Sequence, residues 1–101
     1  MWILQTPRDA DRPLTLKLTR GDAKTLGRAP GADVVVEAPL VSRLHCRLSA
    51  NPAGLEVVDL DSTNGTFVND RRVKRAVLAP GDRVRVGRLT LVVSQAAGDR
   101  R

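Results

Sequence analysis

Short runs of alternating apolar and polar residues constrain the fold of this 101-residue chain more than any other feature. Residues 14–19 read Leu-Thr-Leu-Lys-Leu-Thr, and residues 83–86 read Arg-Val-Arg-Val. A period of two sends successive side chains to opposite faces of a β-strand, so these runs fit strands with one buried face. No window keeps a helical period over several turns, and the chain is therefore predicted to be all-β.

Turn signals separate the predicted strands at short intervals. Pro80-Gly81-Asp82 and Asn69-Asp70 are two examples, and Gly87-Arg88 between two apolar runs predicts a two-residue hairpin. Further strands are predicted over residues 2–6, 24–26, 33–36, 55–59, 66–68 and 89–94, with another beginning at Leu44. Many short strands with regular turns predict a β-sandwich of two packed, mainly antiparallel sheets.

The length and the strand pattern indicate one domain. A chain of 101 residues can bury one independent core, and Trp2 and Phe67 are its only aromatic residues, so Leu and Val must fill that core. The alternation stops near Ser94. We therefore expect a domain over residues 1–95, followed by a tail or linker over residues 96–101.

The charge balance and the cysteine count restrict the partner and the compartment. The chain carries 17 Lys and Arg against 11 Asp and Glu, a net charge of +6. This excess favours a phosphopeptide, a nucleic acid or a membrane surface, and it also fits the coding bias of a GC-rich bacterium. The single cysteine, Cys46, excludes an internal disulfide, and no signal peptide or membrane span is visible. These features predict a cytoplasmic protein without a membrane partner.

Three short clusters of small, hydrogen-bonding or cationic residues lie between the predicted strands. They are Gly27-Arg28, then Ser42-Arg43-Leu44-His45, and then Asp61-Ser62-Thr63-Asn64-Gly65-Thr66. In this order and spacing the clusters resemble the forkhead-associated (FHA) domain, which binds phosphothreonine peptides. The resemblance covers residues 2–94 and implies a β-sandwich whose binding site lies on loops at one end.

A phosphothreonine-binding site needs a positive charge in a fixed position and hydrogen-bond donors, because the phosphate carries about −1.5 to −2 charge and three acceptor oxygens. The resemblance implies that the phosphopeptide is bound by Arg28, Ser42, Arg43, Thr63 and Asn64. The guanidinium groups would fork onto phosphate oxygens, the serine would donate its hydroxyl and its N–H, and the asparagine would hold the peptide main chain. Each residue type also has an ordinary use, as a solvated arginine, a turn serine or an Asn-Gly hairpin. Only their combination favours binding.

Three further residues are expected to support the site without contacting the ligand. The resemblance implies that His45 holds the binding loop in shape by hydrogen bonds. Gly27 is expected to allow a close approach of the backbone, and Gly65 to allow a positive backbone angle.

Cys46 and His45, the only cysteine and the only histidine, are neighbours. The strand predicted to begin at Leu44 puts Leu44, Cys46 and Leu48 on one face and His45 and Arg47 on the other. The thiol and the imidazole then cannot pair as nucleophile and base, and two ligands fall short of a zinc site. The sequence therefore predicts no enzyme, no metal and no cofactor, with Cys46 as a small core residue.

Two segments compete to set the preference beyond the phosphothreonine. Leu40 and Val41, just before the second cluster, predict a preference for an apolar peptide residue. The basic run over residues 71–75, with Arg71 and Arg72 foremost, predicts a preference for acidic residues, a solvated face or a nucleic-acid surface. Base recognition usually needs stacking aromatic side chains, which this chain almost lacks.

The expected function is that of a non-catalytic signalling module that binds a phosphothreonine-containing protein, such as a substrate of a Ser/Thr kinase. The isolated domain is expected to be monomeric. A phosphate-independent protein–protein scaffold on the same fold is the alternative, and a basic nucleic-acid binder is the third hypothesis.

Overall fold

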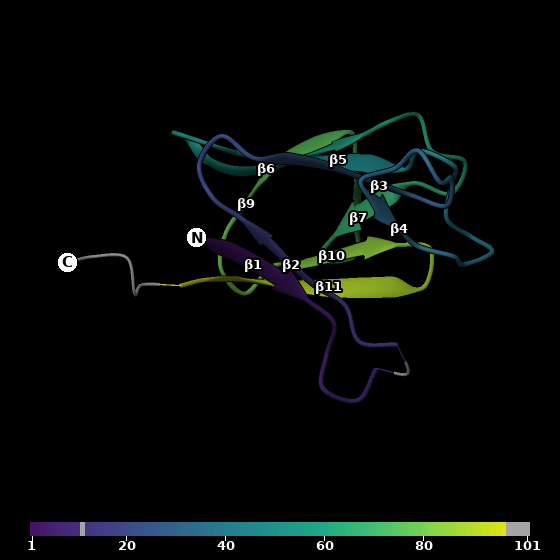
Figure 1. Ribbon diagram of the computed structural model, residues 1–101, viewed down its shortest axis with the longest axis horizontal. Coiled ribbons are helices and arrows are strands. Elements are labelled where there is room, and N and C mark those ends of the chain that lie inside the picture. Colours follow the sequence, from purple (N-terminus) through teal and green to yellow (C-terminus); the bar gives the residue numbers. More distant parts are fainter. Residues whose placement is uncertain (11, 97–101) are drawn as a thin grey trace.

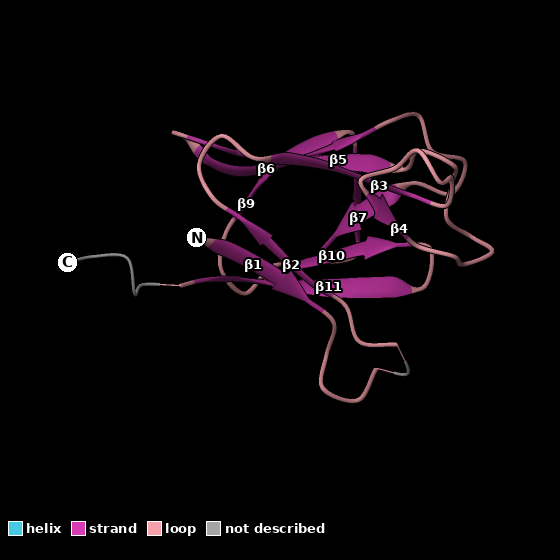
Figure 2. Ribbon diagram, in the orientation of Figure 1, coloured by secondary structure: helices cyan, strands magenta, loops and turns pink. Residues whose placement is uncertain are grey.

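The computed structural model describes residues 1–10 and 12–96, and these residues form eleven β-strands and no helix (Figure 2). The strands are β1 (Trp2–Gln5), β2 (Thr15–Leu18), β3 (Ala23–Gly27), β4 (Val34–Val35), β5 (Cys46–Asn51), β6 (Gly54–Asp59), β7 (Thr66–Val68), β8 (Arg71–Val73), β9 (Arg75–Leu78), β10 (Arg83–Val86) and β11 (Leu89–Gln95). The described part of the chain thus offers no helix that could cross a membrane. Of the predicted tail, residues 97–101 lie outside the described residues.

The strands form two sheets that pack face to face (Figure 1). One sheet has the strand order β2-β1-β11-β10-β7-β8, and the other has the order β4-β3-β5-β6-β9. Among the described strands, β3 and β4 form the one parallel pair, and the other pairs are antiparallel. The structure confirms the predicted β-sandwich of two packed, mainly antiparallel sheets.

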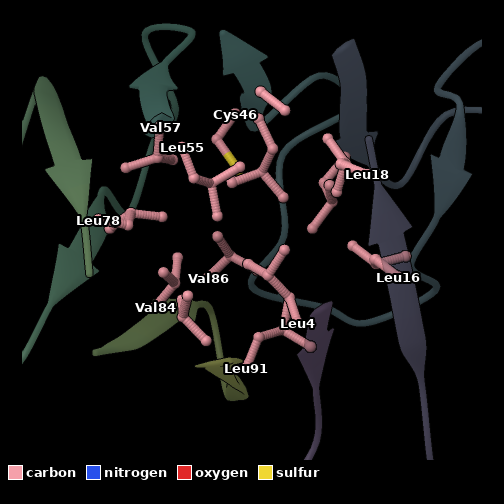
Figure 3. Packing of buried hydrophobic residues seen from close by; sticks show 14 of the residues in the cluster. Leu4, Leu16, Leu18, Cys46, Leu55, Val57, Leu78, Val84, Val86 and Leu91 are labelled. Carbon is pink, nitrogen blue, oxygen red and sulfur yellow. The ribbon is translucent and has the colours of Figure 1, made fainter. Parts of the chain in front are cut away.

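Leucine and valine side chains from both sheets fill the space between them, as predicted. The alternation places them there: in β10, Arg83 is exposed whereas Val84 and Val86 are buried. Figure 3 shows side chains of β1, β2, β10 and β11 facing side chains of β5, β6 and β9. Burying one such side chain contributes about 1.5–3 kcal/mol. This core is the platform from which the loops project.

The strand predicted to begin at Leu44 begins at Cys46 instead. Leu44 is 48% exposed and His45 is fully buried, so the predicted assignment of faces is wrong for these two residues. His45 turns inward because both ring nitrogens hydrogen-bond to the backbone of loops. Cys46 and Leu48 face the core as predicted.

The sequence pattern does not predict strands β8 and β9. Two of the three residues of β8 are arginines, and in β9 one arginine is followed by Ala76-Val77-Leu78, an apolar run that does not alternate. Both lie at sheet edges, where charged side chains are tolerated and hinder pairing with another chain. The turn predicted at Asn69-Asp70 folds β8 back on β7, and both turn residues have positive φ angles, 50° and 69°, as in a type I′ hairpin. The predicted Gly87-Arg88 hairpin is confirmed, since β10 and β11 pair across it.

Three connections gather at one end of the sandwich, at the right in Figure 1, and the N-terminus lies at the other end. They are the β3–β4 connection over residues 28–33, the β4–β5 connection over residues 36–45 and the β6–β7 connection over residues 60–65. The three sequence clusters fall in or beside these connections, so the fold brings together residues far apart in the sequence.

Candidate functional site

The five residues expected to bind the phosphopeptide come from all three connections. Arg28 follows β3, Ser42 and Arg43 precede β5, and Thr63 and Asn64 lie between β6 and β7. Ser42 is half-buried and the other four are exposed. Hydrogen bonds between the connections bring these residues into one surface.

The Arg28 guanidinium is oriented by the neighbouring loop. Its Nε donates to the carbonyl of Val41 at 3.0 Å, and its backbone N–H donates to the carbonyl of Ser42 at 2.9 Å. Among the described residues, neither terminal nitrogen of this guanidinium has a hydrogen-bond partner. The terminal nitrogens of Arg28 are therefore available for a forked contact with an anion.

Gly27 lies where β3 meets the β4–β5 connection. A Cβ at this position would overlap the carbonyl oxygen of Arg43 and lie 2.9 Å from Leu44 Cα. Both obstacles are backbone, which cannot swing aside as a side chain can. Glycine is thus required for the contact, and the adjacent Ala29 N–H donates to the Arg43 carbonyl at 3.1 Å.

Ser42 links two of the connections through its side chain. Its Oγ accepts a hydrogen bond from the Thr63 N–H at 2.9 Å. Its own N–H donates to Nδ1 of His45 at 3.0 Å. The expectation that this N–H binds the phosphate is therefore wrong. Among the described residues the hydroxyl hydrogen has no acceptor, so it can be donated to a ligand.

Asn64 ties the β6–β7 connection to the β4–β5 connection. Its Nδ2 donates to the carbonyl of Leu40 at 3.1 Å. Within the described residues its Oδ1 accepts no hydrogen bond, and the hydroxyl of Thr63 has no partner. One acceptor, one amide hydrogen and one hydroxyl on these two exposed residues are therefore available to a ligand.

His45 is fully buried between two of the connections. The Ser42 N–H must donate to Nδ1, which places the ring hydrogen on Nε2, and Nε2 donates to the carbonyl of Gly65 at 2.8 Å. Both ring nitrogens are thereby used in bracing the loops. This geometry fits the architectural role expected for the residue.

A second support, not predicted from the sequence, is centred on Asp59. Its carboxylate accepts hydrogen bonds from the hydroxyls of Ser62 and Thr66 and from the Ser62 N–H, and Ser62 Oγ accepts from the Gly65 N–H. Burial opposes the charge, but these hydrogen bonds hold the pKa of Asp59 below its ordinary value. The signal in the sequence was an Asp three residues before a serine in a turn.

The residues expected to set the peptide preference lie in different environments. Val41 is 2% exposed and packs in the core, so the expectation that its side chain contacts a peptide is wrong. Leu40 is 39% exposed beside Asn64. Arg72 is exposed. A Cβ placed on Gly65, whose φ is +92°, would lie 2.6 Å from Nε of Arg72. Arg72 therefore borders the site.

The neighbouring cysteine has no reactive character. Cys46 is fully buried, and burial, with the negative charge of Asp59, raises the pKa of its thiol to about 12. The thiolate, which is the nucleophilic form, is not populated near neutral pH. Cys46 is a core residue, as predicted.

The chain is similar to a known domain family over more than half of its length. A family model described as the FHA domain matches residues 24–87. The chain is 43% identical over 88 residues to the ABC transporter ATP-binding/permease protein Rv1747 of Mycobacterium tuberculosis, and the match covers 87% of this chain but 10% of that protein.

Two solved structures resemble the chain over nearly its whole length. The FhaA FHA domain, crystallised in complex with the intracellular domain of Rv3910, has a TM-score of 0.80 and 32% identity, covering 93% of this chain and 100% of that chain. A structure from work on phosphothreonine-dependent FHA domain interactions has a TM-score of 0.79 and 30% identity, covering 94% and 96% of the two chains.

Proposed function

The chain belongs to the FHA domain family, and from this premise we propose that it is a non-catalytic module that binds phosphothreonine-containing segments of other proteins. The observation that carries the proposal is the free end of the Arg28 guanidinium, held by Val41 beside the Ser42 hydroxyl and Asn64. Phosphate capture by arginine and surrounding donors is a recurring mode of peptide recognition.

Each residue of the site has a distinct task in this proposal. The terminal nitrogens of Arg28 bind two phosphate oxygens, and Arg43 supplies a second positive charge. The hydroxyls of Ser42 and Thr63 donate to the remaining oxygens. Asn64 accepts from and donates to the peptide main chain, which sets the direction of the ligand.

The partner is a protein phosphorylated on threonine by a Ser/Thr kinase. The similarity to a domain crystallised with the intracellular domain of another protein, and to domains with phosphothreonine-dependent interactions, supports this assignment. We further propose that residues 1–95 form the binding domain, that it acts as a monomer, and that it works in the cytoplasm.

Calorimetry with a panel of phosphothreonine peptides tests the function. We expect a Kd in the micromolar range, about −8 kcal/mol, because the binding surface is small and formed by loops. Matched phosphoserine and unphosphorylated peptides serve as controls. Equal affinity for phosphorylated and bare peptides would favour a phosphate-independent scaffold and overturn the proposal.

Leu40 is proposed to contact the peptide on the flank that passes the β4–β5 connection. Because its side chain is exposed beside Asn64, we expect an apolar preference at one peptide position on this flank. Scanning single positions of a phosphothreonine peptide against wild type and Leu40→Arg measures this preference. An unchanged profile in Leu40→Arg would remove Leu40 from the site.

A further inference from the structure

A basic face covers part of the outer side of the six-stranded sheet, next to the site. Phe67 of β7 pairs in register with Arg72 of β8 on one side and with Arg85 of β10 on the other. Arg83 lies two residues from Arg85 in β10, while Val84 between them points into the core. We call these four residues, Arg72, Phe67, Arg85 and Arg83, the basic face.

The basic face continues from the loop that carries Asn64. Arg72 Nε would lie 2.6 Å from a Cβ on Gly65, so its guanidinium rests against this loop. Phe67 is three residues beyond Asn64, about 10 Å along an extended chain. A peptide segment of about three to five residues that leaves the site on this side would reach Arg72 and Arg85.

The charges of the basic face are not neutralised within the domain. Across residues 1–10 and 12–96, no carboxylate lies within ion-pair distance of Arg72, Arg83 or Arg85. By contrast, Arg75, the last residue of the basic run over residues 71–75, lies on the five-stranded sheet. It pairs with Glu56 of that same sheet at 3.2 Å. The structure therefore splits the run seen in the sequence and assembles a different cluster from two strands.

The Phe67 ring of the basic face already contacts a side chain of the domain itself. The guanidinium carbon of Arg85 lies 4.2 Å from the centroid of the Phe67 ring, which is a cation–π contact. Single-stranded nucleic acids are held largely by bases that stack on exposed aromatic rings. Trp2, the other aromatic residue, packs against the core from β1. The surface thus offers charge without a stacking platform, which suits carboxylates better than bases.

We propose that the basic face binds an acidic segment that flanks the phosphothreonine in the same partner protein. The inference rests on the proposed function and extends it to the residues outside the phosphate contact. Exposed ion pairs are individually weak, so each acidic residue is expected to raise the affinity about two- to fivefold, and two together about tenfold. Screening by salt should remove most of this gain.

The test compares a short phosphothreonine peptide with neutral flanks and the same peptide extended by about five residues. The extension is placed on either flank in turn and carries either two Glu or two Gln. Titrations use wild type, Arg72→Gln/Arg85→Gln, and the control Arg20→Gln/Arg47→Gln, which removes two exposed charges elsewhere. Arg72→Gln alone is the second variant in case the loss of Arg85 disturbs the fold.

We expect the Glu extension on one flank to bind about tenfold more tightly than the Gln extension at low salt. The gain should vanish in Arg72→Gln/Arg85→Gln, fall by about half in Arg72→Gln, and persist in the control variant, while the short peptide binds all variants alike. Equal binding of Glu and Gln extensions on both flanks, or an equal loss in the control, would overturn the inference.

Two other outcomes have their own meaning. An oligothymidylate that binds wild type as tightly as the acidic peptide, and that loses binding in Arg72→Gln/Arg85→Gln, would assign the face to nucleic acid and overturn the inference. Failure of wild type to bind any short phosphothreonine peptide would overturn the proposed function itself and this inference with it.

Discussion

The two ends of the sandwich differ in how far along the chain their side-chain hydrogen bonds reach. Away from the site, the turn over residues 19–22 has a side-chain bond between near neighbours: Asp22 accepts from the backbone N–H of Thr19, three residues earlier, at 2.8 Å. At the site, Asn64 Nδ2 donates to Leu40, 24 positions away, and His45 Nε2 donates to Gly65, 20 positions away. The side-chain bond of this turn can form locally, whereas the site is complete only after the β4–β5 and β6–β7 connections have come together.

Removing the phosphate-facing charge should have the largest effect. We expect Arg28→Ala to cost about 2–5 kcal/mol of binding, because it leaves phosphate oxygens unpaired. A micromolar Kd would then rise to between tens of micromolar and millimolar. Arg20→Ala, an exposed arginine in the turn at the other end, is the matched control. Calorimetry that finds the same affinity for Arg28→Ala and wild type would show that Arg28 is an ordinary surface charge.

The two ends should also respond differently to an added methyl group. Gly27→Ala is expected to cost about 3 kcal/mol of stability, because the Cβ meets the backbone of Arg43 and Leu44. Gly81→Ala meets nothing within 4 Å and strains only a φ of +95°, for about 1 kcal/mol. Urea unfolding midpoints measure both changes. Equal losses in the two variants would contradict the close approach at Gly27.

Truncating the buried histidine should act through stability. His45→Ala leaves the Ser42 N–H and the Gly65 carbonyl without partners, at a cost of about 1–3 kcal/mol. Thr19→Val removes an exposed hydroxyl bond at the other end and should change stability by less than about 0.5 kcal/mol. Thermal melts of the variants, with peptide titrations, separate the effects. A fully stable His45→Ala that binds no peptide would make His45 a direct ligand contact.

Low pH should lower the stability of both ends of the sandwich, by less than the substitutions above. The loss at each end can be assigned to one aspartate. The pKa values of Asp59 and Asp22 lie below the ordinary 3.8 in the folded chain, so their stabilisation is present above that pH and is lost as the pH falls through the folded values. Asp59→Asn and Asp22→Asn should each flatten the loss of stability below about pH 4. NMR shifts of residues 63–66 should respond to Asp59→Asn alone. Equal responses to both variants would mean that the ends are coupled.

Much of the fold could be predicted because its signals are local. Alternation in residues 14–19 and 83–86, with turns such as Gly87-Arg88, is enough to indicate short antiparallel strands. The arginines of β8 and the exposed Val77 of β9 hid two edge strands, because an exposed edge tolerates side chains that obscure the alternation. The strand pattern also could not predict that His45 turns inward, since backbone groups of two loops hold its ring.

The sequence by itself determined the fold class, the family resemblance and the residue types of the site. Only the tertiary structure decided that Val41 is buried, that Asp59 braces the third loop, and that Arg72 and Arg85 share a face with Phe67. Alternation and turns depend on neighbours in the chain, so they can be read from it. The pairing of separate strands and loops depends on how two sheets pack, and no short stretch of sequence records that.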